Sequence, residues 1–250
     1  MTDRQINIFR DKQALADAAA TQIVHTFRTA MQERGYFNIA LAGGSTPRLL
    51  YERLAQTPRT MELDWNRVNV FWSDERAVPL EHDDSNYRMV REALQHLLIP
   101  KANVHPMYGN SADLDAAARS YERVIKSAVP GNPPRFDVVL LGMGPDGHAA
   151  SLFPHSPALQ AGGLVTATPE APLEPHVQRL TFTFRLINAA AEVLVLVAGD
   201  DKAEMVHRVL EGERDPQTLP VQGVAPENGT LFWMLDQGAA RDLSQRKGGS

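Results

Sequence analysis

Cysteine is absent from the 250-residue sequence. Without it the chain can form no disulfide framework, use no catalytic thiol and offer no thiolate ligand to a metal. This absence is typical of proteins from a reducing compartment, so the sequence favours a cytoplasmic location.

An excess of positive charge and a long apolar run are also missing. The 25 basic residues are outnumbered by 30 acidic ones, which gives a formal charge of -5. Such a chain has no global basic field for nucleic acid or an anionic membrane, so a small anion needs a local site. The longest apolar run, 193–198, is too short to span a bilayer, and residues 1–9 lack the apolar core of a secretory signal. We therefore predict no nucleic-acid partner and no membrane partner.

No linker rich in proline, glycine or serine divides the chain. We predict a single domain over residues 1–250, present as a monomer or a small homo-oligomer. Three prolines within residues 169–175 predict an irregular connection. Residues 241–250 are expected to form a frayed tail.

What the sequence does contain is an alternation of short apolar runs, turns rich in glycine or aspartate, and stretches with helical periodicity. Four strand-to-helix units are expected: strand 37–41 with a helix from Pro47, strand 67–72 with a helix over 86–98, strand 136–141 with a short helix after His148, and strand 192–198 with a helix over 201–210. Further strands are expected at 180–184 and 230–235. The alternation predicts the α/β class, with a mostly parallel sheet flanked by helices.

Ligands of such sheets bind beyond the carboxyl ends of the strands, so the strand-to-helix turns indicate where a site would lie. The first turn holds Gly43, Gly44, Ser45 and Thr46, followed by Pro47. Glycines let the backbone approach a ligand, Ser45 or Thr46 can cap the helix, and proline suits the first helical position. Free N–H groups at this point favour a phosphate, although an ordinary capped turn explains the residues equally well.

The second turn places Asp74, Glu75 and Arg76 after an apolar strand. The planar fork of Arg76 suits a phosphate or a carboxylate, whereas Glu75 is expected in a solvated charged loop. His82 and the nearby carboxylates raise a metal hypothesis, but Asp84 or Ser85 is better explained as the cap of the next helix. No metal site is predicted.

The third turn, 142–148 (GMGPDGH), is the most informative. It contains the G-x-G-x-x-G pattern of dinucleotide-binding turns, but the acidic residue that should follow about 20 residues later is missing. Asp146 lies two residues before His148, where a carboxylate can orient a proton-transferring imidazole. A capping aspartate beside a packed histidine is the alternative. In the remaining turns, Arg179 precedes a strand and Lys202 follows one, where each is a candidate phosphate grip or an ordinary surface charge.

Together these turns resemble the 6-phosphogluconolactonase family, which is related to the glucosamine-6-phosphate deaminases. The matching stretches, in chain order, are 41–47 (LAGGSTP), 72–76 (WSDER), 84–87 (DSNY), 142–148 (GMGPDGH) with 150–154 (ASLFP), and 199–202 (GDDK). They cover the chain from about residue 39 to residue 235, and the Asp-Gly-His stretch is the most specific.

The resemblance implies a modified doubly wound, Rossmann-like fold and the hydrolysis of 6-phosphoglucono-1,5-lactone in the oxidative pentose phosphate pathway. It implies no metal and no organic cofactor, and a phosphorylated sugar lactone as the partner. His148 and Asp146 would be the reacting pair. The implied substrate-binding residues are Gly43, Gly44, Ser45, Thr46, Asp74, Arg76, Asn86, Gly144, Gly147, Arg179 and Lys202. Arg179 matches the family most loosely.

Three rival functions remain. A deaminase-isomerase of amino sugar phosphates resembles the same turns, but that family has Asn-Glu where Leu152 and Phe153 stand, and tyrosine in place of Arg76. A sugar-phosphate sensor would normally carry a basic DNA-binding segment, and only about 35 weakly basic residues precede the first expected core strand. A nicotinamide-dependent oxidoreductase rests on the glycine pattern alone.

Overall fold

A six-stranded parallel sheet forms the centre of the computed structural model, which describes residues 3–244. The strand order is β1-β9-β8-β5-β2-β3. The bounds are β1 Asp3–Phe9, β2 Phe37–Leu41, β3 Val68–Trp72, β5 Val138–Leu141, β8 Glu192–Val197 and β9 Thr230–Asp236. Every neighbouring pair in this sheet is parallel, as the alternation of strands and helices predicts.

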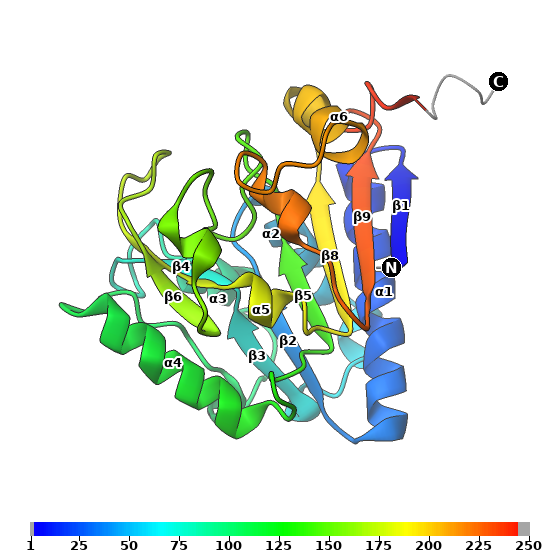
Figure 1. The fold of residues 1–250 in the computed structure, drawn as a ribbon. Coiled ribbons are helices and arrows are strands. Elements are labelled where there is room, and N and C mark those ends of the chain that lie inside the picture. The colour runs from blue at the N-terminus through cyan, green and yellow to red at the C-terminus, as the bar shows by residue number, and fades with distance from the viewer. Residues whose placement is uncertain (1–2, 245–250) are drawn as a thin grey trace.

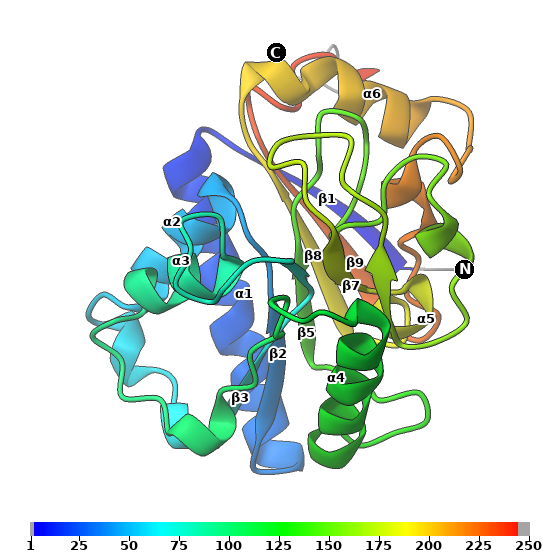
Figure 2. The same cartoon turned by 90° about the vertical axis from the view of Figure 1, so that its left-hand side faces the viewer.

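Helices cover both faces of the sheet (Figures 1 and 2). On one face lie α1 Lys12–Glu33, α2 Ser45–Leu54 and α3 Asn86–Ala93, and on the other lie α4 Leu114–Ala128, α5 Phe184–Ile187 and α6 Ala203–Glu211. Short 3-10 helices occur at η1 Arg59–Met61, η2 Trp65–Arg67, η3 Lys101–Asn103, η4 Pro157–Gln160, η5 Asp200–Lys202 and η6 Pro220–Gly223. All residues of β2 and β5 are buried, as expected for central strands between two helical layers.

A second, antiparallel sheet has the order β4-β7-β6. Its strands are β4 Asp74–Arg76, β6 Val165–Thr168 and β7 Arg179–Phe182. The strand expected at 180–184 therefore belongs to this sheet and ends earlier, because Phe184 begins α5. The register pairs Arg76 directly with Arg179.

Several elements differ from the sequence-based expectation. The expected helix after His148 is absent: Ala149 and Leu152 form an isolated bridge, and Ala150 has a φ of 51°, which a helix does not allow. Helix α3 ends at Ala93, because the chain forms a turn after it. In the expected tail, residues 241–244 are held by the buried Leu243 and by Ser244, whose N–H donates to Glu211, while 245–250 lie outside the described residues.

The order of the strands defines where a ligand should bind. From β2 the chain moves outward to β3 on one side, whereas β5, β8 and β9 follow on the other side. The gap between the carboxyl ends of β2 and β5 is thus the topological switch point of the sheet. The glycine turn 42–44 and the turn 142–148 both begin at this point.

The helices also bear on membrane association. No helix within residues 3–244 is long and apolar enough to cross a bilayer. Residues 3–33 form β1 and α1 of the central fold, so they are not a separate DNA-binding segment.

Candidate active site

A cavity of about 520 Å³ opens at the switch point. Residues from the ends of β2, β4, β5, β7 and β8 line it, as an open α/β sheet favours. The predicted site residues that it brings together are Gly43, Gly44, Ser45, Thr46, Asp74, Arg76, Asn86, Gly144, His148, Arg179 and Lys202.

His148 and Asp146 form a hydrogen-bonded pair. Asp146 Oδ1 lies 2.6 Å from His148 Nδ1 and also accepts from the His148 backbone N–H at 3.1 Å. Burial raises the pKa of the Asp146 carboxyl, but the hydrogen bond and the charge of His148 outweigh this effect and lower it. An ionised Asp146 therefore holds the proton on Nδ1, which leaves Nε2 as the proton acceptor.

The glycines of this turn make room for the pair. A Cβ on Gly144 would lie 2.0 Å from His148 Nδ1, so only glycine fits beneath the ring. Gly147 has a φ of 80°, its carbonyl accepts from the Val221 N–H, and its α-carbon faces Leu219. Gly147 and Asp146 thus stabilise the turn without lining the cavity. For Gly147 this differs from the expectation of a substrate-binding residue.

Two arginines, the buried Arg179 and the half-buried Arg76, face the cavity from the antiparallel sheet. Arg76 and Arg179 are directly opposed across β4 and β7, and like charges in this position repel each other. Neither guanidinium Nε has a hydrogen-bond partner among the described residues. Burial lowers the pKa of Arg179, while the nearby Asp74 opposes this shift. Two neighbouring cations, each with an unpartnered Nε donor, form a wall that suits an anion, and we call it the anion-binding wall.

Asn86 and Asp74 hold this wall in place. The amide of Asn86 donates to the Asp74 carbonyl at 2.9 Å and accepts from the Arg76 guanidinium. Asp74 accepts from the Ser151 hydroxyl at 2.6 Å. Asn86 packs so closely against the first turn that a Cβ on Gly43 would lie 1.9 Å from its Oδ1.

Glu75 is completely buried, which corrects the prediction of a solvated loop. Its carboxylate accepts from the N–H groups of Arg76, Asn86 and Tyr87, each at 2.8 Å, and from the Ser85 hydroxyl at 3.1 Å. Burial raises the pKa of Glu75 although these backbone bonds lower it. The sequence alone suggested exposure, because three adjacent charged residues usually lie in solvent. Here four hydrogen-bond donors stabilise the buried carboxylate of Glu75.

The first turn is open to an anion. Gly44, with a φ of 103°, is the N-cap of α2, and no side chain caps this helix, contrary to the expectation for Ser45 or Thr46. Pro47 occupies the third helical position rather than the first. Tyr51 fixes the turn by bonding both the N–H and the carbonyl of Ala42. The free N–H groups of α2 therefore face the cavity.

Sequence reasoning missed several of the lining residues, among them Lys12, Met143, Asp201 and Asp236. Lys12 reaches in from α1, and Met143, Asp201 and Asp236 complete the wall near β5 and β8. Asp201 and Met143 lie inside motifs that were recognised, so their proximity could have been inferred. Lys12 and Asp236 carry no local signal, because only the packing of α1 and the pairing of β9 bring them to the cavity.

The geometry also tests the rival chemistries. The glycine pattern 142–147 does not open a helix, as a dinucleotide-binding turn requires. Ser85 caps α3 by accepting from the Arg88 N–H, as expected for the segment that raised the metal hypothesis. Between residues 3 and 244, no three His, Asp or Glu side chains are grouped to hold a metal ion.

The fold and the cavity define a doubly wound α/β protein with a histidine-carboxylate pair beside an anion-binding wall. Residues 10–233 match the family described as glucosamine-6-phosphate isomerases/6-phosphogluconolactonase. The chain belongs to this family.

Similar proteins were found both in sequence and in structure. The chain is 42% identical to a 6-phosphogluconolactonase of Synechocystis, over 96% of this chain and 98% of the relative. The structure of 6-phosphogluconolactonase from Trypanosoma brucei superimposes with a TM-score of 0.84 at 30% identity, covering 98% of this chain and 100% of that one. A monomeric glucosamine-6-phosphate deaminase reaches a TM-score of 0.81 at 22% identity, over 95% and 99% of the two chains, and shares the fold alone.

Proposed function

We propose that this protein hydrolyses 6-phosphoglucono-1,5-lactone to 6-phosphogluconate, a step of the oxidative pentose phosphate pathway. The observation that carries the proposal is the hydrogen-bonded pair of His148 and Asp146 beside a cavity that is also lined by Arg76 and Arg179, neither of which forms an ion pair among the described residues. Relatives named 6-phosphogluconolactonase align with nearly the whole chain.

In the proposed mechanism, His148 Nε2 takes a proton from a water molecule as the water oxygen attacks the lactone carbonyl carbon. Asp146 stabilises the imidazolium that forms. The carbonyl oxygen becomes negative in the tetrahedral intermediate, and arginine or backbone N–H donors stabilise it. When the intermediate collapses, the bond to the ring oxygen breaks and His148 returns the proton to that oxygen.

The deaminase branch requires different chemistry after the histidine. That branch has a carboxylate where Leu152 and Phe153 stand, and both of these apolar side chains are buried here. Phe153 packs against the His148 ring, with the centroids 4.6 Å apart. No carboxylate is available at this point to assist the opening of an amino sugar, which supports lactone hydrolysis.

The experiment is a comparison of two lactones. Freshly made 6-phosphogluconolactone should release protons far faster with the enzyme than without it, whereas gluconolactone should be a much poorer substrate. Anion contacts remote from the carbonyl orient the reacting centre, so the phosphate should raise kcat/KM. Equal kcat/KM values would contradict the phosphate assignment, and release of ammonia from glucosamine 6-phosphate would favour the deaminase.

The proposal includes a cytoplasmic location and a monomeric or small homo-oligomeric state. The absence of cysteine and the negative formal charge support such a location for an enzyme of small metabolites. Gel filtration at several concentrations measures the oligomeric state directly.

A further inference from the structure

Lys12 is a cation in a place where helix geometry disfavours one. It is the first residue of α1, and neither α1 nor α2 has an acidic residue in its first turn. The positive ends of helix dipoles repel cations, so this position weakens α1 slightly. Lys12 Nζ lies 3.0 Å from the Ser45 hydroxyl, which begins α2 at the open turn of the cavity. Two helix N-termini and a lysine thus converge on one point.

No carboxylate neutralises this lysine. Asp11, its neighbour, caps α1 by accepting from the Ala14 N–H and pairs with Arg10. In the described part of the chain, Lys12 takes part in no ion pair within 4.0 Å.

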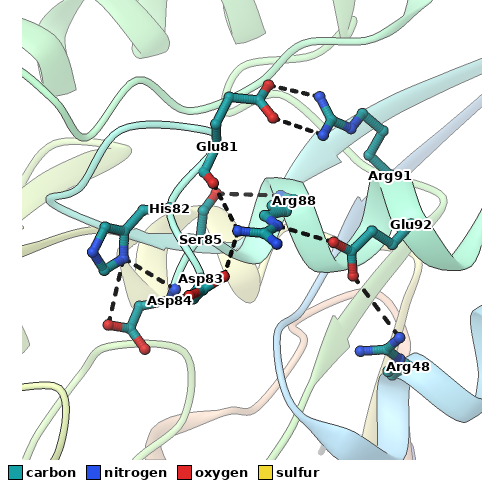
Figure 3. Close-up of polar contacts among 9 residues, drawn as sticks. All are labelled: Arg48, Glu81, His82, Asp83, Asp84, Ser85, Arg88, Arg91 and Glu92. Atoms are coloured by element: carbon teal, nitrogen blue, oxygen red, sulfur yellow. Dashed lines mark hydrogen bonds and ion pairs between the residues drawn. The ribbon is translucent and has the colours of Figure 1, made fainter.

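The cations just outside the cavity behave differently. Figure 3 shows Arg88 and Arg91 of α3 paired with Glu92 and Glu81, and Arg48 of α2 directed toward Glu92. None of these arginines lines the cavity. Charge on the surface around α2 and α3 is thus locally balanced, and the positive charge at the α2 N-terminus is left for a ligand.

We propose that Lys12 binds the phosphate group of the substrate, together with the N–H groups of α2 and Ser45. The assignment rests on the proposed function and adds a residue from α1 to the site. When the phosphate binds, the ammonium exchanges its hydrogen bond with Ser45 for a charge-assisted bond to a phosphate oxygen. An uncharged hydroxyl of the sugar would leave the Lys12 ammonium and the uncapped N-terminus of α2 uncompensated, so the phosphate is the part of the substrate that fits here.

The test measures binding of the product, 6-phosphogluconate, by calorimetry at low salt. Lys12→Met should weaken binding about tenfold, which corresponds to one lost charge-assisted hydrogen bond at a half-buried position. Lys12→Arg should largely restore it. The matched control is Lys101→Met, since Lys101 is an exposed lysine of η3 outside the cavity, and it should bind like wild type. In the proton-release assay, Lys12→Met should raise KM and leave kcat within about twofold.

A double-mutant cycle separates phosphate binding from a merely structural tie between α1 and α2. If Lys12 only positions Ser45, the substitution Lys12→Met should have no effect in a Ser45→Ala background; direct phosphate binding predicts that the loss persists and shrinks at high salt. Unchanged affinity of Lys12→Met, or equal losses for gluconate and 6-phosphogluconate, would overturn the proposal. Wild-type protein that binds inorganic phosphate through Lys12 but not 6-phosphogluconate would instead refute the proposed function and support the anion site.

Discussion

His148 owes its orientation to three neighbours of different kinds. Asp146 holds Nδ1, Gly144 leaves room beneath the ring, and Phe153 packs against its face. The same Phe153 ring lies 5.3 Å from the guanidinium carbon of Arg179. One aromatic side chain therefore separates the proton acceptor from the anion-binding wall, which places both within reach of a single small substrate.

Replacing His148 by alanine should remove most of the catalysed rate. Loss of a positioned general base typically lowers the rate by about 10²–10⁴-fold, and the defect should appear in kcat. Initial proton release from fresh 6-phosphogluconolactone measures the rate, and circular dichroism with 6-phosphogluconate binding checks that the variant is folded.

The matched control is His155, which is exposed and lies outside the cavity. Because its φ is 57°, asparagine is the suitable replacement at that position, and His155→Asn should retain near wild-type activity. A folded His148→Ala variant with wild-type kcat would show that another group is the base.

At the scale of elements, the N-terminus of α3 is held both by its own cap, Ser85, and by a carboxylate of strand β4. Glu75 of β4 accepts from the N–H groups of Asn86 and Tyr87, and this contact fixes both Asn86 and Arg76 at the cavity. A carboxylate at a helix N-terminus is also favoured by the helix dipole. The geometry of the arginine wall therefore depends on a residue that does not line the cavity.

Glu75→Gln should lower both stability and substrate affinity. Glutamine cannot accept from all four donors, and each buried donor left unpaired costs about 1–3 kcal/mol. Urea unfolding should show the loss of stability, and KM should rise because Arg76 and Asn86 lose their support.

Glu52 of α2 offers a matched control for that substitution, since its side chain is 42% exposed and, among the described residues, pairs with Arg48 alone. Glu52→Gln should change neither quantity appreciably. If Glu75→Gln matched wild type in stability and KM, the network around Glu75 would have no role in positioning the wall.

A second inter-element contact predicts how stability varies with pH. Glu192 of β8 accepts from Gln22 and Thr26 of α1; burial raises its pKa, and these hydrogen bonds only partly oppose the shift. The folded state therefore holds this proton at pH values where the unfolded chain has lost it. Its contribution is largest below the ordinary glutamate pKa and is lost as pH rises through the folded value.

Glu192→Gln should consequently gain stability relative to wild type as the pH is raised. Urea unfolding of both proteins at pH about 4 and pH about 8 measures the difference. Glu204→Gln, at an exposed position of α6, is the control and should follow wild type at both pH values. A wild-type advantage that grew with pH would contradict the raised pKa of Glu192.

Much of the architecture was predictable because strand, turn and helix each leave a local signal. The bounds of β2 were predicted without error, and those of β3, β8 and β9 to within a residue. Helix α1 was missed although Asp11 caps it and its small apolar residues repeat at helical spacing. Strand β4 could not be recognised, because it consists of three charged residues, and Asp74 and Glu75 are buried only through contacts with distant parts of the chain.

For the same reason, some residues of the site could be predicted from the sequence and others could not. Turns that follow buried strands predicted His148, Asp146, Arg76 and Lys202, since each lies beside a glycine turn or a strand end. Lys12 could not be found in this way, because its place depends on how α1 packs against α2.

For the molecule as a whole, we expect activity to be independent of metal ions. The chain has no cysteine, and residues 3–244 contain no group of His, Asp and Glu suited to a metal. Dialysis against EDTA should leave kcat/KM unchanged. Loss of activity that a single metal restored would contradict this expectation.

The pairing of β1 with β9 has a consequence for how the chain folds during synthesis. The pairs β2–β3 and β8–β9 join segments that leave the ribosome in close succession, but β1 is made first and must wait for residues 230–236. Contacts between distant segments form slowly, because closing a long loop costs entropy before any pairing compensates it. The nascent chain therefore carries α1, and with it Lys12, without the strand β9 that pairs with β1 until residues 230–236 have been made.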